Sequence, residues 1–299
     1  MFFEAGSYIM RRHVVYGNLY DAQRWEWTFN ATPRMCSITW DTIKPEENMQ
    51  GNPLPKHLTW ALMFMNLYLT EVISTSLAGA DEKTFRKWVW LFVEAIEAKT
   101  YDVIRFERRL ENRNGNVCTT SVDGVDFAIM EPRPNWNNKR RWSGYFSEKF
   151  NGPGLRREIG MCISTGNFVW VNGPFPAAYS DLQIFRKDLI DEMGEGEKVV
   201  ADQGYNGEKD YIVTSKYLRK MGELGQLDDY FKVRARHECG NRRLKVWNIL
   251  GHRFRHGLHK HGMVFRAVAV IEQLKMDNGS PMFPVVWEDY GLGILEMNI

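Results

Sequence analysis

The sequence predicts an α/β protein in which a helical region precedes a mixed sheet flanked by helices. Three observations predict this class. Apolar residues recur at three- and four-residue steps before residue 112, strand-like runs follow from residue 117, and helices then alternate with strands up to about residue 250. Strands followed by alternating helix and strand are typical of a layered α/β sheet.

Composition places the chain among ordinary globular proteins. It has 299 residues, 44% of them hydrophobic and 25% charged, which is enough for one large domain or two smaller ones. The net charge of +2 does not itself indicate nucleic-acid binding, so the positions of the basic residues matter. The cysteines are widely spaced, which argues against a zinc knuckle or a disulfide scaffold and favours a reducing compartment. They are Cys36, Cys118, Cys162 and Cys239.

The N-terminus lacks the basic start and apolar core of a signal peptide. No apolar stretch reaches the roughly 20 residues that a membrane-spanning helix needs. We therefore expect a soluble intracellular protein that has no membrane partner.

The first third of the chain is predicted to be helical from residue 56. Residues 1–55 show no clear pattern, so no element is assigned to them. Apolar spacing predicts a helix from His57 to Leu69 and a short one from Val72 to Leu77. A glycine turn and a capping aspartate, Asp81, then precede a helix over residues 82–99.

These three helices have the outline of a helix-turn-helix, within a helical region over residues 56–112. In that motif the first residues of the last helix reach the major groove of DNA. The basic residues at this position are Lys83, Arg86 and Lys87. From spacing alone, a plain helical hairpin with a solvated basic face fits equally well.

Three strand-like runs follow, over residues 118–130, 155–165 and 168–172. A polar, proline-containing segment, residues 133–142, separates the first two. Basic and aromatic side chains coincide there, which suits a phosphate backbone and unpaired bases, although a surface cluster with packed tryptophans is the alternative. The residues concerned are Lys139, Arg140, Arg141 and Trp142.

The remaining elements place acidic residues at the ends or middle of strands. After a helix over residues 181–193, a strand over 198–201 ends at Asp202, where open α/β sheets carry functional residues. Asp123 lies in an otherwise apolar strand, where a buried charge needs a partner or a metal. Alternation places Asp126 on the opposite face and does not tell which of the two faces the site. Asp181 is most simply a helix N-cap and is a further candidate ligand.

A long helix over residues 228–250 supplies a third acid. Successive residues of a helix are about 100° apart, so residues at steps of three, four and seven fall on one narrow stripe. On this stripe an acid lies between two basic residues. That stripe contains Phe231, Arg234, Glu238 and Lys245. The opposite face is apolar and is expected to pack on the sheet, so that Arg234, Glu238, Arg242 and Lys245 point outward.

Such a surface suits a metal ion together with phosphate. An exposed helix with ion pairs of about 0.3–0.5 kcal/mol each is the alternative. Gly240 costs about 1 kcal/mol relative to alanine inside a helix, which leaves a break in the helix open.

Positive charge gathers around Glu238. Residues 232–260 contain nine Lys or Arg and one acid. His252 and His256 are four residues apart, a spacing at which two histidines bind zinc, but no His-Glu-x-x-His pattern is present. A basic, DNA-facing patch is the preferred interpretation, with zinc as the alternative.

Asp123, Asp202 and Glu238 together indicate a metal-dependent nuclease. Carboxylates from different elements can meet in one pocket and hold two Mg²⁺ ions. Such a pair of ions acts on the attacking and leaving oxygens of a phosphodiester during an in-line displacement.

Five short segments, in order, resemble DDE superfamily transposases of the Harbinger type. They are Val-Asp-Gly-Val-Asp-Phe-Ala-Ile (122–129), Gly-Leu-Arg-Arg-Glu-Ile-Gly (154–160), Phe-Val-Trp-Val-Asn-Gly-Pro-Phe-Pro (168–176), Ser-Asp-Leu-Gln-Ile-Phe-Arg (180–186) and Val-Ala-Asp-Gln-Gly-Tyr (200–205). The 35 residues between Asp202 and Glu238 match the family spacing. The helix is similar to the family signature Tyr-x2-Arg-x3-Glu-x6-Lys, with Phe231 in place of the tyrosine. The resemblance covers roughly residues 56–287.

The resemblance implies an RNase H-like DDE catalytic domain over residues 117–287, followed by a tail over 288–299. It implies that Asp123, Asp202 and Glu238 form the catalytic triad, with Asp123 preferred to Asp126 because it precedes the glycine of the family pattern. The implied cofactor is a pair of Mg²⁺ or Mn²⁺ ions. The implied partners are double-stranded DNA at transposon ends and target, an accessory DNA-binding protein and further copies of the chain, in the nucleus.

Two other functions fit the same residues. One is a domesticated DNA-binding protein that keeps the transposase fold without chemistry. The other is a nuclease that hydrolyses DNA without joining the freed 3′-hydroxyl to a target.

Overall fold

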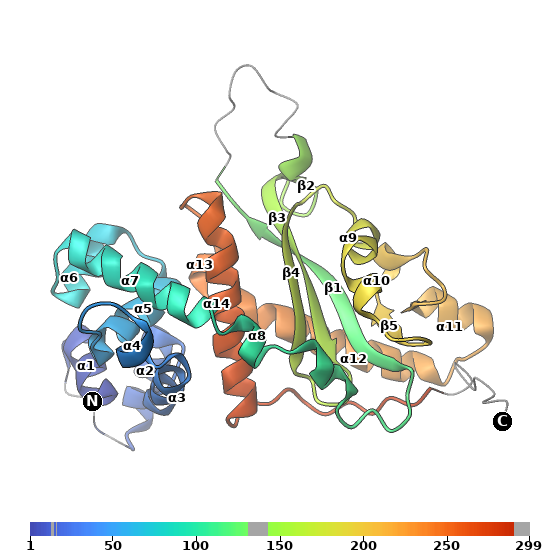
Figure 1. Ribbon diagram of the computed structural model, residues 1–299, viewed down its shortest axis with the longest axis horizontal. Coiled ribbons are helices and arrows are strands. Elements are labelled where there is room, and N and C mark those ends of the chain that lie inside the picture. Colours follow the sequence, from blue (N-terminus) through green and yellow to red (C-terminus); the bar gives the residue numbers. More distant parts are fainter. Residues whose placement is uncertain (13–14, 16, 131–142, 290–299) are drawn as a thin grey trace. The chain divides into compact units, whose positions relative to one another are not determined.

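The structure is a computed structural model that describes residues 1–12, 15, 17–130 and 143–289 (Figure 1). The chain forms two compact units. The helical unit comprises Met1–Val103 and Arg243–Gly279, and the sheet unit comprises Ile104–Arg242 and Ser280–Ile299. The predicted DNA-binding residues Lys139, Arg140, Arg141 and Trp142 lie outside the described residues, as does the end of the tail.

The helical unit begins with the segment to which the sequence assigned no element. Its helices are α1 (Phe2–Ile9), α2 (Leu19–Phe29), α3 (Pro33–Ile43), α4 (Pro45–Asn48), α5 (Pro55–Leu67), α6 (Glu71–Ala78), α7 (Glu82–Glu97), α8 (Thr100–Val103), α13 (Asn248–Gly251) and α14 (Leu258–Asp277). Helix α7 packs against α5 and α14. The apolar residues Phe85, Trp88, Phe92 and Ile96 recur at three- and four-residue steps along α7 and are buried at the centre of this unit.

The three helices predicted between residues 57 and 99 are confirmed as α5, α6 and α7. Gly79 ends α6 with a φ of 60°, a left-handed conformation that glycine adopts without strain. Asp81 caps α7, as predicted, by accepting a hydrogen bond from Thr84 N at 3.0 Å. In the described part of the chain, no helix combines the length and apolar character needed to cross a membrane.

The sheet unit contains a mixed six-stranded sheet. Its strands are β1 (Cys118–Ala128), β2 (Phe146–Ser147), β3 (Gly152–Cys162), β4 (Phe168–Pro176), β5 (Lys198–Ala201) and β6 (Ile212–Val213). Central β1 pairs antiparallel with β3 and parallel with β5, while β4 and β2 pair antiparallel with β3, and β6 lies parallel to β5. This mixed sheet flanked by helices is consistent with the expected RNase H-like core.

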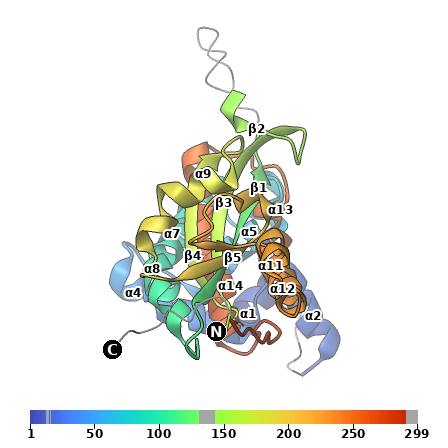
Figure 2. The same cartoon turned by 90° about the vertical axis from the view of Figure 1, so that its right-hand side faces the viewer.

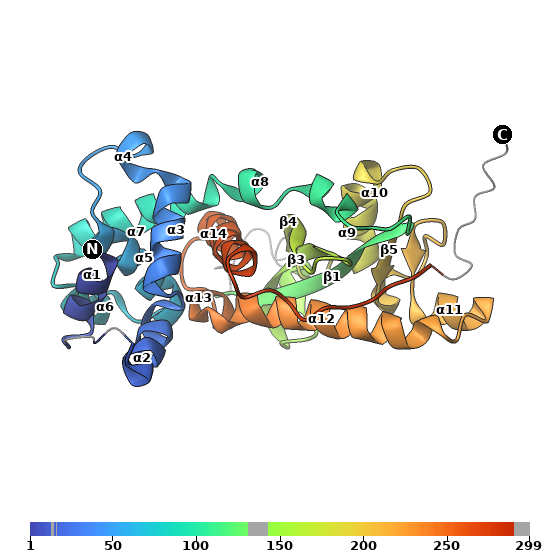
Figure 3. The ribbon, with the colours of Figure 1, turned by 90° about the horizontal axis from the view of Figure 1, so that it is seen from below.

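Helices cover both faces of the sheet (Figures 2 and 3). One face carries α9 (Asp181–Lys187) and α10 (Leu189–Glu192), and the other carries α11 (Ser215–Met221) and α12 (Gln226–Val246). Neighbouring residues of β5 divide between the two cores, because side chains alternate along a strand. Val199 packs with Phe185 on the α9 face, and Val200 packs with Val233 on the α12 face. Short 3-10 helices η1 (Phe106–Leu110), η3 (Ser143–Tyr145) and η4 (Gln203–Tyr205) connect these elements.

Two predicted helices differ from the observed ones. The helix predicted over 181–193 is divided at Asp188 into α9 and α10. The Asp188 carboxylate accepts a hydrogen bond from Nδ2 of Asn172, a residue of β4, at 2.9 Å. The helix predicted over 228–250 ends at Val246, and α13 follows after Trp247. Gly240 does not break it. A Cβ at Gly240 would lie 2.6 Å from Met161 Sδ, so the glycine lets α12 approach the sheet closely.

Candidate active site

Asp123 lies in the middle of β1 and is buried against α12. Its Oδ1 accepts a hydrogen bond from Arg234 Nη2 at 2.9 Å, and its Oδ2 accepts one from Asn241 Nδ2 at 2.7 Å. Arg234 also donates to the carbonyl oxygen of Val122 at 3.0 Å. A buried carboxylate needs such partners, because burial without them costs several kcal/mol. On sequence grounds, the buried charge of Asp123 is expected to have a partner or a metal. In the structure its partners are Arg234 and Asn241.

Arg234 links Asp123 to the acid one helical turn further along α12. The nitrogen that contacts Asp123, Nη2, lies 3.8 Å from Glu238 Oε1. The Arg234 side chain is only 12% exposed, whereas that of Glu238 is 65% exposed. Burial lowers the pKa of Arg234, but the charge and hydrogen bond of Asp123 and the charge of Asp202 outweigh it and raise that pKa. The expectation that Arg234 points outward is therefore wrong, because the buried Asp123 draws it inward.

Asp202 occupies the carboxyl end of β5, as predicted, next to β1. Val122 pairs with Ala201, so the two acids follow paired residues on adjacent parallel strands. The Asp202 side chain caps η4 by accepting a hydrogen bond from Gly204 N at 2.8 Å. This cap fixes the carboxylate at the edge of the sheet.

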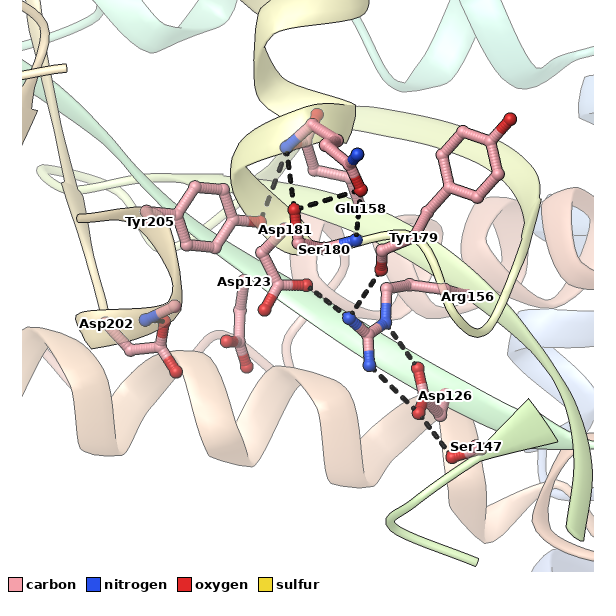
Figure 4. A network of polar contacts seen from close by, with 12 residues as sticks. Asp123, Asp126, Ser147, Arg156, Glu158, Tyr179, Ser180, Asp181, Asp202 and Tyr205 are labelled. Atoms are coloured by element: carbon pink, nitrogen blue, oxygen red, sulfur yellow. Dashed lines mark hydrogen bonds and ion pairs between the residues drawn. The ribbon is translucent and has the colours of Figure 1, made fainter. Parts of the chain in front are cut away.

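Asp181 approaches the same place from the α9 face. Figure 4 shows the carboxyl groups of Asp123, Asp181 and Asp202 pointing toward a common region. A Cβ at Gly204 would lie 2.7 Å from Asp181 Oδ2 and 3.0 Å from Asp202 Oδ1. A Cβ at Gly124 would lie 1.9 Å from Asp181 Oδ1. Both glycines therefore provide the space that the Asp181 carboxyl group occupies.

The electrostatics of Asp181 reflect these neighbours. Burial, together with the charges of Asp202, Asp123 and Asp126, raises its pKa to about 6, although Arg156 opposes this shift. The N-cap of α9 is Ser180, whose Oγ accepts from Gln183 N, so the interpretation of Asp181 as the cap is wrong. Asp181 is free of a capping role and lies among the other acids.

Asp126 faces away from Asp123 and belongs to a separate ion-pair group. Arg156, its partner in the β1–β3 register, donates Nε to Asp126 Oδ1 at 2.7 Å. Ser147 Oγ donates to Asp126 Oδ2 at 2.7 Å. Arg156 Nη1 also lies 3.3 Å from Asp181 Oδ1, so this arginine stands between Asp126 and Asp181 (Figure 4).

A fully buried acid, Glu158, lies beneath this group on β3. Its Oε2 accepts from Trp170 Nε1 at 3.0 Å, and its Oε1 accepts from Tyr205 Oη at 3.4 Å. Burial raises the pKa of Glu158 to about 8, and the charge of Asp181 adds to the shift. Glu158 is therefore protonated at neutral pH, which reduces the negative charge packed behind Asp181.

The types of donor atom suit a hard divalent cation, which binds carboxylate and amide oxygens. Asn241 Oδ1 is buried and accepts no hydrogen bond from any described residue, whereas Asp181 Oδ1 has the ion pair with Arg156 at 3.3 Å as its contact. Within the described ranges, however, no three acidic, histidine or cysteine side chains are grouped as metal ligands. The residues fit a divalent cation by chemistry, and Arg234 provides the positive charge next to Asp123 and Glu238.

The predicted DNA-contacting residues have mixed surroundings. Arg242 is exposed and lies on the part of α12 that belongs to the sheet unit. Lys245 is half-buried and lies among the last residues of α12, which belong to the helical unit. On α7, Lys83, Arg86 and Lys87 are exposed, and Arg86 makes a two-pronged ion pair with Glu71 at 2.7 and 2.8 Å.

His256 packs among aromatic rings, including Phe64 and Trp90, instead of meeting His252 as a metal ligand. Burial and the charges of Lys260 and Arg255 lower the pKa of His256, which disfavours the protonated form expected of a charged patch.

Three residues of the site were missed by sequence reasoning: Asn241, Arg156 and Glu158. Asn241 stands three residues after Glu238, on the stripe that contains Arg234, so helical spacing was a usable signal. The usable signal for Glu158 was that it is an acidic residue within the otherwise apolar end of a predicted strand. Nothing in the sequence indicated that Arg156 bridges Asp126 and Asp181.

Comparison with known proteins identifies the family. The family described as DDE superfamily endonuclease matches residues 122–273, just over half of the chain. The match begins at β1 and includes Asp123, Asp181, Asp202 and Glu238. Searches of curated proteins and of solved structures found no match. The extent of the family match shows that this chain belongs to the DDE superfamily endonucleases.

Proposed function

We propose that the protein is a DDE-type transposase or endonuclease that cuts DNA phosphodiesters at the acids around the end of β5. The observation that carries the proposal is the approach of Asp202 and Asp181 to one point, beside an Asp123 whose partner Arg234 also contacts Glu238. Asp123, Asp202 and Glu238 would hold two Mg²⁺ or Mn²⁺ ions. When bound, such ions activate water and stabilise the leaving oxygen in an in-line displacement.

The chain's own residues prepare this site. Arg234 and Asn241 fix the Asp123 carboxylate from α12, and the capping bond to Gly204 fixes Asp202. Glu238 is the most exposed of the three acids, so it meets incoming DNA first. Arg234 has a second role in this proposal, because its charge lowers the repulsion between the acids and a phosphodiester.

The finer features of the proposal come from the resemblance to Harbinger-type transposases. They are nuclear location, joining of the freed 3′-hydroxyl to target DNA, an accessory DNA-binding protein and self-association. The helix-turn-helix outline of α5–α7 and the basic residues Lys83, Arg86 and Lys87 would bind DNA. Arg242, Lys245 and the segment with Lys139, Arg140, Arg141 and Trp142 would contact further phosphates.

The test is a nicking assay on labelled terminal-repeat DNA with Mg²⁺ or Mn²⁺. We expect Asp123→Ala, Asp202→Ala and Glu238→Ala each to lose more than about 100-fold in nicking, since even the outer partners of metal ligands are worth about 10–100-fold. DNA binding should remain in all three variants. Joined products would separate a transposase from a nuclease that only hydrolyses.

A non-catalytic DNA-binding protein is the second candidate, and one observation favours it. Asp123 is already neutralised by Arg234, so the arrangement is stable without a metal. Under this alternative, wild-type protein binds terminal-repeat DNA and makes no nicks with either cation. Nicking that disappears in the Glu238→Ala variant would reject it.

A further inference from the structure

A basic pocket lies in the sheet unit, beside η4 and α11. Its volume is about 310 Å³, which lies at the lower end of the roughly 300–1,000 Å³ of ligand pockets. Lys209, Lys216 and Lys220 line it, and we call it the lysine pocket. Lys216 and Lys220 are four residues apart on α11, so they lie on one face of that helix.

Three lysines and one acid line the lysine pocket, so its lining carries a net positive charge. The three lysines are exposed, and none has a carboxylate within ion-pair distance among the described residues. Glu208 also lines the pocket, but its Oε1 lies 2.6 Å from Arg186 and is neutralised by it. The charge of this pocket therefore favours an anion.

Part of the pocket wall is apolar. Ile212, Tyr217 and Met221 line the pocket, and Met221 is 56% exposed. A small inorganic anion would gain nothing from such a wall. A phosphate group attached to a sugar would place the phosphate among the ammonium groups and the sugar against Tyr217 and Met221.

The pocket is joined rigidly to the acids. Asp202 caps η4, and Tyr205, the last residue of η4, lines the pocket. Gln203 Nε2 donates to Ser215 Oγ at 2.7 Å, which ties η4 to the first residue of α11. Tyr205 is fully buried and donates to Glu158, so this side of the pocket is fixed in the core.

We propose that the lysine pocket binds backbone phosphates of the DNA strand next to the phosphodiester that is cut. This inference rests on the proposed function, because it takes DNA as the substrate of the neighbouring acids. Because η4 joins Asp202 to the pocket and phosphates repeat along a strand, a strand bound at Asp202 would have further phosphates to offer the lysines. Lysine ammonium groups are point charges suited to phosphates that are held without base recognition.

The first experiment locates the contact. Wild-type protein is acetylated on its lysines with and without a labelled 30-base-pair terminal-repeat duplex, and modified lysines are quantified by mass spectrometry. We expect the DNA to protect Lys216 and Lys220 at least several-fold. Lys44, which is exposed and paired with Glu47, is the internal control and should stay reactive. Protection by inorganic pyrophosphate but not by DNA would overturn the proposal, because it would indicate a small-anion site.

The second experiment measures the charge. A Lys209→Gln/Lys216→Gln/Lys220→Gln variant is compared with a matched variant in which the exposed residues Lys44, Lys149 and Lys187 are changed to Gln. Each lost phosphate contact should reduce the slope of log affinity against log salt by about 0.9. We expect a reduction of at least that size in the pocket variant and a smaller one in the control, with both variants folded by circular dichroism.

The outcomes separate this inference from the proposed function. Equal slopes in the two lysine variants, together with Mg²⁺-dependent nicking by the wild type, would overturn the lysine pocket and leave the nuclease intact. Protected lysines without any nicking would refute cleavage and leave a phosphate-binding pocket on a DNA-binding protein. A wild-type chain that shows neither binding nor protection would overturn the lysine pocket as well.

Discussion

Replacing Arg234 by methionine should destabilise the sheet unit strongly, because it leaves the Asp123 carboxylate buried without its counter-charge. The side chains of Arg234 and Asp123 are 12% and 10% exposed, so water replaces little of what is lost. Loss of one member of a buried pair costs about 3–5 kcal/mol. We expect the Arg234→Met variant to lose that much free energy of unfolding at neutral pH.

The assay is urea unfolding, with hydrogen exchange of the β1 amides to identify the transition of the sheet unit. Arg242→Met is the matched control, since Arg242 is an exposed arginine on the same helix and should change stability by no more than about 0.5 kcal/mol. Adding Asp123→Asn to Arg234→Met removes both charges and should recover most of the loss. Equal costs for Arg234→Met and Arg242→Met, or no recovery in the double variant, would refute the ion pair as the support of Asp123.

Three further predictions follow from the acids. The pKa of Glu158 is about 8 in the folded chain, against its ordinary value of 4.5, so between these two values the unfolded chain binds fewer protons than the folded chain. The free energy of unfolding therefore falls as pH rises from about 5 to 8, and the contribution of Glu158 is constant above pH 8. Glu158→Gln should remove the fall between about pH 6 and 8, which is on the order of a few kcal/mol, in urea unfolding across pH 5–9, and parallel curves would contradict it. Gly124→Ala should cost about 1–3 kcal/mol, because its Cβ would meet Asp181 Oδ1, and the cost should shrink in an Asp181→Ala background; an unchanged cost would exclude this contact. Mg²⁺ should raise the melting temperature of Arg234→Met more than that of the wild type, because the cation replaces the lost positive charge; equal shifts would argue against a cation beside Asp123.

Elements with local signals were predictable. Strand β5 occupies the predicted residues, because a short apolar run followed by Asp-Gln-Gly both forms and ends it. The cap at Asp81 follows from its side chain and the helix after it. Helix α2 was not visible, because it exposes Leu19, Tyr20 and Trp27, each by about 70%, and these apolar residues hide its buried stripe.

The geometry of the site required information that no local pattern holds. Asp123 and Arg234 are far apart in sequence, and their contact depends on how α12 lies on the sheet. The helical spacing placed Arg234 beside Glu238 correctly but could not show that a buried acid on β1 would draw the guanidinium inward. The sequence indicates Asp181 as the N-cap of a helix. Serine and aspartate cap helices equally well, so the sequence could not show that Ser180, one residue earlier, is the cap.

The most direct test of the central claim compares cleavage by the wild type and Glu238→Gln on labelled terminal-repeat DNA, with Mg²⁺, with Mn²⁺ and with a chelator. If the acids at the end of β5 form a metal-dependent nuclease site, the wild type nicks the DNA with either cation and not with the chelator. The Glu238→Gln variant then binds the DNA with unchanged affinity and leaves it intact. Equal nicking by the two proteins, or nicking that persists in the chelator, would contradict the claim.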